Sequence, residues 1–304
     1  MTREAKINVI LLLVAIMLSL LAWWQPFLST KQWYFLSDIK RDNITTIRIE
    51  RKDLDTIVLN KENNNWFLEQ PYTLAANPLR VDTLTALVEK QSYSRFESAD
   101  EDLYRYELDK PLLTISFNHS RFVFGGIDPV KRHRYVMNID DNAQSGKNTV
   151  HLINGVIYYQ LRSALNTFIS PSLLPPSAHI NAISWLGKTL KNKDNKWLLT
   201  PDDPKITSDS IAQLLQFWQH AQASKIETNV DFAIDKASAQ SRSLLINITY
   251  PYGDKIKTED IKYLIIQQDK QLKLVRLDYK LAYWISPQTL KSITEFLPVQ
   301  ETME

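Results

Sequence analysis

The chain has 304 residues, of which 44% are hydrophobic, and this is enough to bury the core of one large domain or of two ordinary ones. It contains no cysteine, which excludes disulfide bonds, thiolate nucleophiles and cysteine-ligated zinc or iron–sulfur sites. The 36 lysines and arginines nearly balance the 34 aspartates and glutamates. We therefore expect no nucleic-acid partner, because nucleic-acid binders carry a clustered basic excess.

The N-terminal segment is strongly apolar. Residues 7–24 carry no charged side chain, and this length is just sufficient for a helix that crosses the hydrocarbon core of a membrane. Arg3 and Lys6 before it also fit the start of a cleavable signal peptide, but no small-residue cleavage site follows. Instead the segment continues into aromatic residues that are typical of a membrane interface: Trp23, Trp24, Trp33 and Tyr34.

These features predict a tail and uncleaved transmembrane anchor over residues 1–30 and a juxtamembrane linker over residues 31–42. The tail is short, so we expect it inside and the bulk of the chain outside, although Lys31, Lys40 and Arg41 weaken the charge asymmetry. In a Gram-negative bacterium this predicts a single-pass inner-membrane protein with most of its chain in the periplasm.

The rest of the chain repeats an order of features. Alternating apolar residues such as Ile47 and Ile49 predict strands, and a polar turn then precedes Trp66. A similar order leads to Trp197. After each tryptophan comes a proline and then a helix with an apolar stripe, which consists of Val81, Leu84, Leu87 and Val88 in one copy and Ile211, Leu214, Leu215 and Trp218 in the other.

Later segments also pair between the copies. Residues 112–118 match 243–250, residues 122–126 match 263–268, and residues 150–160 match 275–285. Each copy then closes with a helix before a proline. The sequence therefore predicts an α+β fold in which an N-terminal transmembrane helix precedes two tandem, similar units, each a mainly antiparallel sheet with two helices. The predicted domain boundaries are 43–176, 177–298 and a C-terminal tail over 299–304.

Signatures of chemistry are missing. The chain has none of the common hydrolase motifs, and its six glycines are too few for a phosphate-binding loop. Its five histidines share no metal-ligand spacing. The acidic residues 97–104 are interpreted as a solvated connection and residues 140–146 as a hairpin turn. We predict no catalytic residue, metal or cofactor, while an enzyme of unrecognised type remains an alternative.

The most distinctive stretch is residues 124–136. Gly125, Gly126 and Asp128 mark a turn between strands, and Lys131, Arg132 and Arg134 concentrate positive charge there. Backbone N–H groups exposed by the glycines and these cations would suit an anionic group or an acidic partner. The alternative is a hairpin tip with solvated basic residues. The second copy lacks the glycines and the basic cluster at the matching place, which favours a role particular to the first unit.

The combination of motifs resembles a bacterial domain-of-unknown-function family. The motifs are Y-x-L-D-K-P over residues 106–111, F-G-G-x-D-P over 124–129, R-Y-V over 134–136 and L-L-P over 173–175. Glu107 stands where the family usually has a glycine, which puts the tight turn before Leu108 in question. Members of this family are membrane-anchored and are often encoded beside auxiliary and permease components of ABC-type transport systems related to gliding motility.

The resemblance implies no catalytic residue. Together with the predicted anchor, it leads to the hypothesis of a non-enzymatic accessory or scaffold protein, anchored in the inner membrane, for an ABC-type envelope transport complex. The expected partner is then a membrane protein such as an ABC-type permease. The alternative hypothesis is a module that binds an anionic envelope ligand, a lipid head group or a glycan, through Lys131, Arg132 and Arg134.

Overall fold

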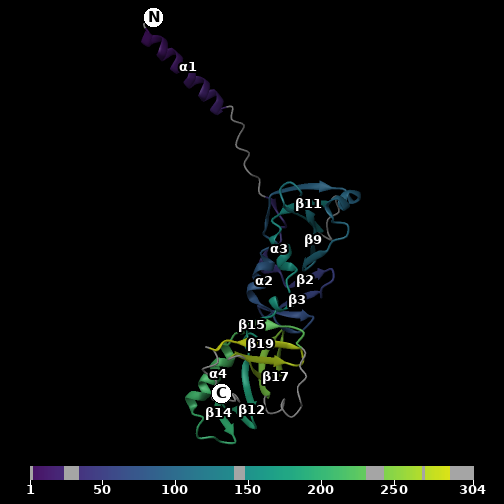
Figure 1. The fold of residues 1–304 in the computed structure, drawn as a ribbon, viewed down its shortest axis with the longest axis vertical. Helices are drawn as coiled ribbons and strands as arrows, with labels where there is room; N and C mark the ends of the chain where they lie inside the picture. The colour runs from purple at the N-terminus through teal and green to yellow at the C-terminus, as the bar shows by residue number, and fades with distance from the viewer. Residues whose placement is uncertain (1–2, 24–33, 140–147, 231–242, 269–270, 288–304) are drawn as a thin grey trace.

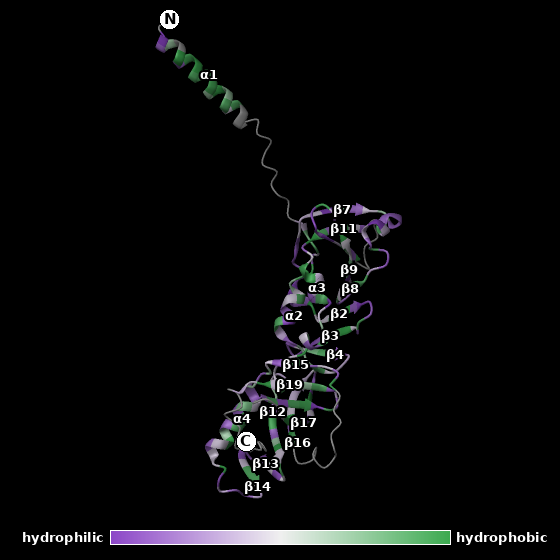
Figure 2. Cartoon of the chain, in the orientation of Figure 1, coloured by the Kyte–Doolittle hydropathy of each residue, from purple (hydrophilic) through white to green (hydrophobic). Residues whose placement is uncertain are grey.

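The structure of the protein, a computed structural model, describes residues 3–23, 34–139, 148–230, 243–268 and 271–287. It begins with helix α1 (Arg3–Trp23), whose hydropathy is shown in Figure 2. Most of the remaining chain forms antiparallel sheets. Two large sheets are stacked end to end in Figure 1, and a small sheet pairs β1 (Tyr34–Phe35) with β6 (Gln91–Ser92).

Helix α1 does not bear out the predicted anchor. Within the described residues, no helix combines the length and the apolar character that are needed to cross a membrane. The predicted transmembrane helix is therefore wrong, and so is the single-pass inner-membrane location with a periplasmic bulk, which rested on it. The physical reason lies in the first turns of α1, where Arg3, Glu4 and Lys6 are charged. The uncharged part that remains, Ile7–Trp23, is about 25 Å long, less than the ~30 Å of a hydrocarbon core.

The first large sheet has nine strands in the order β5-β4-β3-β2-β8-β9-β10-β11-β7. Its strands are β2 (Thr46–Arg51), β3 (Ile57–Glu62), β4 (Asn65–Gln70), β5 (Leu74–Ala75), β7 (Ser94–Ser98), β8 (Leu113–Phe117), β9 (Ser120–Ile127), β10 (Arg134–Ile139) and β11 (Asn148–Ile153). With it go the helices α2 (Pro78–Thr85) and α3 (Val156–Leu161) and the short 3-10 helices η1 (Arg41–Asn43), η2 (Asp100–Tyr106) and η3 (Leu165–Thr167). This sheet and its helices are called the first unit below.

The second large sheet has eight strands in the order β14-β13-β12-β16-β17-β18-β19-β15. They are β12 (His179–Trp185), β13 (Lys188–Lys193), β14 (Lys196–Thr200), β15 (Lys225–Glu227), β16 (Ser243–Tyr252), β17 (Lys255–Gln268), β18 (Gln271–Arg276) and β19 (Leu281–Ile285). Helix α4 (Ser208–His220) accompanies them, and together they form the second unit.

The two strand orders are equivalent. Apart from β5, each strand of the first sheet has a counterpart in the same place of the second, so that β4 corresponds to β14, β8 to β16 and β11 to β19. The sequence match of residues 150–160 with 275–285 is therefore one strand out of step, since it set β11 against the end of β18. What differs from the predicted fold class is the balance of elements: the chain is mainly antiparallel sheet, with few helices and without the transmembrane helix.

The repeated tryptophan follows a repeated hairpin. Asn63 and Asn64 join β3 to β4 with φ values of 49° and 64°, and Asp194 and Asn195 join β13 to β14 with 51° and 62°. Positive φ at both central residues defines a type I′ turn, which asparagine and aspartate tolerate and which suits the twist of paired strands. Trp66 and Trp197 are each the second residue of the strand that follows.

Helices α2 and α4 begin at side-chain caps. Asn77 accepts a hydrogen bond from the Leu79 N–H at 3.1 Å, and Pro78 starts α2. The side chain of Thr207 caps α4 in the same way. Helix α2 ends before Leu87 and Val88, which stay buried all the same. The predicted closing helix of the first unit is divided into α3 and η3, and that of the second unit lies outside the described residues.

One hydrophobic core runs through both units. At their junction the Phe67 ring on β4 lies 6.3 Å from the ring of Tyr250 and 5.0 Å from that of Tyr252, both on β16. The Asn63 side-chain amide donates to the Gly253 carbonyl at 2.7 Å, and the Tyr252 hydroxyl donates to Glu69. The hairpin of β16 and β17 thus packs against the hairpin of β3 and β4, and this contact joins the two sheets.

Candidate functional site

The predicted basic loop is a tight turn between β9 and β10 that Asp128 organises. One carboxylate oxygen of Asp128 accepts from the Lys131 N–H at 2.7 Å, and the other accepts from the Tyr135 hydroxyl at 3.3 Å. The Asp128 N–H donates to the His133 carbonyl at 2.7 Å, and its own carbonyl accepts from the Arg132 N–H at 2.9 Å. Asp128 is therefore the side chain that closes the turn.

The two glycines serve close packing. A Cβ atom on Gly125 would lie 2.2 Å from the Tyr106 carbonyl oxygen, and one on Gly126 would lie 3.0 Å from the carboxyl carbon of Glu107. The end of η2 therefore crosses directly over β9 at these glycines. Glu107 adopts the left-handed conformation with φ 57°. The tight turn before Leu108 is therefore present, although a glutamate stands where the family usually has a glycine.

The structure separates the predicted cations. Arg134 is only 7% exposed, its guanidinium lies 3.7 Å from the centre of the Tyr158 ring, and it donates to the Gly125 carbonyl at 2.5 Å. Lys131 and Arg132 are exposed on the turn. Of the six residues predicted for this site, these two basic side chains are the ones that face solvent together.

The predicted interfacial aromatic residues are only partly described. Tyr34 belongs to β1, and the guanidinium of Arg95 lies 4.2 Å from the centre of its ring. Trp23 is the last residue of α1. The Trp23 side chain, Trp24 and Trp33 lie outside the described residues.

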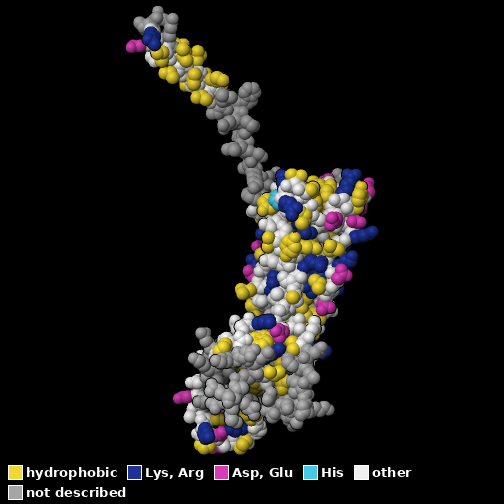
Figure 3. All heavy atoms as spheres, viewed as in Figure 1, with side chains coloured by type: hydrophobic (Ala, Val, Ile, Leu, Met, Phe, Trp, Pro, Cys, Tyr) yellow, Lys and Arg dark blue, Asp and Glu magenta, His cyan; other side chains and the backbone are white. Residues whose placement is uncertain are grey.

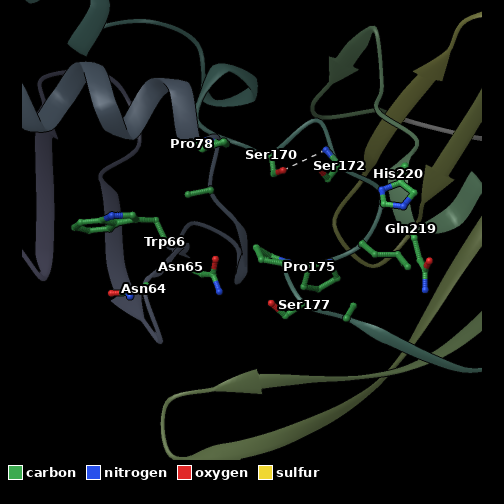
Figure 4. Close-up of a pocket in the computed structure, with 14 residues that line it drawn as sticks. Asn64, Asn65, Trp66, Pro78, Ser170, Ser172, Pro175, Ser177, Gln219 and His220 are labelled. Atoms are coloured by element: carbon green, nitrogen blue, oxygen red, sulfur yellow. Dashed lines mark hydrogen bonds between the residues drawn. The ribbon is translucent and has the colours of Figure 1, made fainter. Parts of the chain in front are cut away.

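A groove of about 480 Å³ lies where the two units meet. Figure 4 shows Trp66 and Asn64 on one side, His220 and Gln219 on the other, and Pro175 between them. The two sides come from β4 with its preceding turn and from the end of α4. The lining residues are Asn64, Asn65, Trp66, Ala76, Pro78, Ser170, Ser172, Leu174, Pro175, Pro176, Ser177, Ala178, Gln219 and His220.

The described lining of this groove carries no carboxylate, ammonium or guanidinium group. Its polar groups are amides, hydroxyls and one imidazole. Elsewhere on the first unit, basic and acidic side chains are scattered among hydrophobic ones over the face shown in Figure 3. The groove therefore differs from its surroundings in being polar yet nearly neutral, beside an indole ring.

The sequence of the chain matches a known protein family. A model described as a domain of unknown function, DUF4340, matches residues 66–244. The chain belongs to the DUF4340 family. The expected membership of an uncharacterised domain family is thus confirmed. The match begins at Trp66 and continues past Pro176 into β16, so the DUF4340 domain includes parts of both units. No curated protein and no solved structure matches this chain.

A buried ionic cluster in this DUF4340 protein lines a second, smaller hollow, which shares Leu174 and Pro175 with the groove. Arg276 is 4% exposed and lies 2.7 Å from Asp278 and 3.2 Å from Glu259. Burial by itself would lower the pKa of Arg276, but the hydrogen bond to Asp278 and nearby groups outweigh it and raise that pKa. The Tyr250 hydroxyl donates to Glu259 at 2.8 Å, and burial together with this bond raises the pKa of Tyr250. The Tyr250 ring in turn lies 6.3 Å from the ring of Phe67 in the first unit.

Within the described residues, no three His, Asp or Glu side chains are grouped so that they would hold a metal ion. The groove between the units was not predicted from the sequence. Its residues come from four separate segments, and each segment alone looks like an ordinary turn or helix end. The one sequence feature that pointed toward such a groove was the repeat, since two units on one chain must contact each other somewhere.

Proposed function

We propose that this DUF4340 protein is a non-enzymatic accessory or scaffold protein of an ABC-type transport complex, which it serves by binding another protein. The link to transport rests on the resemblance described above. Protein binding is supported by one observation in the second unit, where strand β14 leaves an apolar side chain uncovered.

Leu198 on β14 holds the same position as Phe67 on β4. Phe67 pairs with Asn60 of β3, and Leu198 pairs with Lys191 of β13, on the equivalent sheet face. Phe67 is 2% exposed because Tyr250 and Tyr252 cover it, whereas Leu198 is 51% exposed. In addition, β5 continues the first sheet beyond β4, while β14 is the edge strand of the second sheet among the strands that the structure describes.

An edge strand with an exposed leucine favours the binding of an added strand from a partner. Its unpaired backbone groups supply hydrogen bonds, and the apolar side chain supplies contact area. In the first unit, the equivalent surface around Phe67 is covered by the hairpin of β16 and β17. The second unit therefore offers a partner the surface that the first unit uses internally.

The experiment is site-specific photo-crosslinking of the full chain in its native cells. A photoreactive residue at position 198 should give an adduct with a subunit of a transport complex. Leu277 is the matched control, because it is also a leucine and is 50% exposed. A pattern of adducts common to both positions, or no protein adduct from position 198 in a folded variant, would contradict the proposal.

Lys131 and Arg132 support a second candidate function, the binding of an anionic ligand. Both are exposed on one turn. The matching stretch of the second unit, residues 267–275, lacks the glycines and the basic cluster in its sequence. The variant K131E/R132E should bind less to vesicles of anionic lipid, or to an acidic glycan, than the wild type. K191E/K193E, which places the same charge change on exposed positions of β13, is the control. Equal binding by all three proteins would exclude this candidate.

A further inference from the structure

Trp66 and Trp197 hold equivalent positions, but only Trp66 lines the groove between the units. Both indoles pack partly against the hydrophobic core. The difference arises because the second unit continues the chain beside β4, which brings Pro175, Ser177 and the end of α4 opposite Trp66 (Figure 4). The groove is thus a product of how the two units join.

The polar side chains around this indole are available to a ligand. In the described part of the chain, the side chains of Asn64, Gln219 and His220 form no hydrogen bond with another protein group. Asn64 is held at the groove by its type I′ turn, and Gln219 and His220 by the last turn of α4. Amide groups offer both donors and acceptors, and the imidazole adds one or two more.

The absence of charged groups from the described lining decides which ligand chemistry fits. A carboxylate or phosphate would find no cation there, and an ammonium group would find no anion. An indole face accepts a flat apolar surface, while surrounding amides and hydroxyls accept and donate to hydroxyl groups. Sugars present that combination, with C–H groups on one face of the ring and hydroxyls at its rim.

We infer that the groove between the two units binds a neutral oligosaccharide, with one sugar ring stacked on Trp66 and its hydroxyls bonded to Asn64 and Gln219. The groove volume of about 480 Å³ lies within the range of about 300–1,000 Å³ that is usual for small-molecule sites. This site is separate from the Leu198 edge, so failure of the crosslinking test above would leave it unaffected.

The test is a titration of the full chain with three neutral trisaccharides, maltotriose, cellotriose and chitotriose, followed by calorimetry and tryptophan fluorescence. At least one should bind saturably. W66A should weaken that binding by about 10-fold or more, because the stacked ring contributes most of the apolar contact. W197A, at the equivalent position outside the groove, should leave the affinity unchanged.

A second variant guards against misfolding and against a neighbouring site. Trp66 also lines an adjoining hollow that contains Lys40, Arg41, Asp82 and Glu89, whereas Gln219 lines the groove between the units and is not part of that hollow. Q219A should therefore weaken binding by several-fold with an unchanged thermal midpoint. No binding of any of the three sugars up to about 10 mM, a concentration that would detect even millimolar affinity, overturns the inference. So does a bound sugar that responds equally to W66A and W197A.

Discussion

Strands β4 and β14 follow the same turn, carry the same tryptophan and stand at the same place in equivalent sheets, yet their outer faces differ. Phe67 on β4 is buried by the second unit, and Leu198 on β14 is open to solvent. The hairpin is set locally by two left-handed turn residues. The burial of the side chain after the tryptophan, Phe67 or Leu198, depends on which other parts of the chain pack against it.

The opposite end of the sheets differs as well. Val150 of β11 and Ala282 of β19 each belong to a small apolar cluster on the outer sheet face. In the first unit, Leu103 of η2 and Leu108, just after it, belong to this cluster, and the end of η2 crosses β9 at Gly125. The glycine pair, which the sequence marked as a turn, is thus explained by this crossing.

The largest effect is expected at the junction. F67A should lower the free energy of unfolding by about 3–5 kcal/mol, because a buried aromatic ring is replaced by a cavity. L198A at the equivalent position should change it by about 0.5 kcal/mol or less, since half of that side chain is already in water. Urea unfolding of both variants measures the difference. Equal losses would show that Phe67 and Leu198 are not differently packed.

The next prediction concerns how stability depends on pH. Equivalent buried positions on β11 and β19 carry different titratable groups, His151 and Tyr283. His151 on β11 is 4% exposed, and burial together with the charge of Arg95 lowers its pKa from 6.5 to about 4. The unfolded chain therefore binds more protons between these values. Stability should fall by roughly 3 kcal/mol as the pH drops from 6.5 to 4. Unfolding of H151Q across this range should lack that share of the decrease.

Tyr283 takes the corresponding place on β19, and its burial raises its pKa from 10.0 to about 12. Here the unfolded chain loses its proton first, so stability should fall by roughly 2–3 kcal/mol as the pH rises from 10 to 12. Y283F should remove this alkaline loss and leave the acid one, with H151Q showing the reverse. If both variants changed the same limb of the pH profile, the assignment of these groups would be wrong.

A smaller effect should separate the two glycines of β9. G125A should cost about 1–3 kcal/mol, because the new methyl group meets the backbone carbonyl of Tyr106 at 2.2 Å. G126A meets only the mobile end of the Glu107 side chain and should cost about 0.5 kcal/mol or less. Thermal unfolding of the two variants side by side provides the measurement. A G126A loss as large as that of G125A would contradict this account.

The smallest effect is expected at the basic turn. K131A and R132A should each change the free energy of unfolding by about 0.5 kcal/mol or less, because both side chains are exposed. R134A, by contrast, should destabilise the first unit, since its guanidinium is buried on Tyr158. Chemical unfolding of the three variants ranks them. A large loss in K131A would indicate that the turn needs more than Asp128 to close.

How far the sequence predicts this molecule depends on the range of the interaction. The asparagine turns, the caps at Asn77 and Thr207 and the alternating strands are local patterns, and the structure contains them. The end of α2 does not follow from the local pattern. Leu87 and Val88 belong to the predicted apolar stripe and are buried, but they lie in the turn that follows the helix. The N-terminal prediction was wrong because the uncharged part of α1 begins only at Ile7 and ends at Trp23, and this part is shorter than a hydrocarbon core.

The predicted anion site shows the same limit. Arg134 and the two glycines stand out in the sequence, but the contacts that explain them are made with residues far away in sequence, Tyr158 and the end of η2. The groove at Trp66 was missed because it exists only once the second unit is in place. Contacts between residues more than a hundred positions apart produce no periodic pattern in the sequence.

The shared core has a consequence for how the chain comes apart. Because the rings of Phe67, Tyr250 and Tyr252 pack across the two sheets, neither half can lose its packing without exposing apolar surface in the other. We expect one cooperative unfolding transition for both units rather than two. A fragment that stops at Pro176 would carry an uncovered aromatic face, and it should aggregate or remain partly folded.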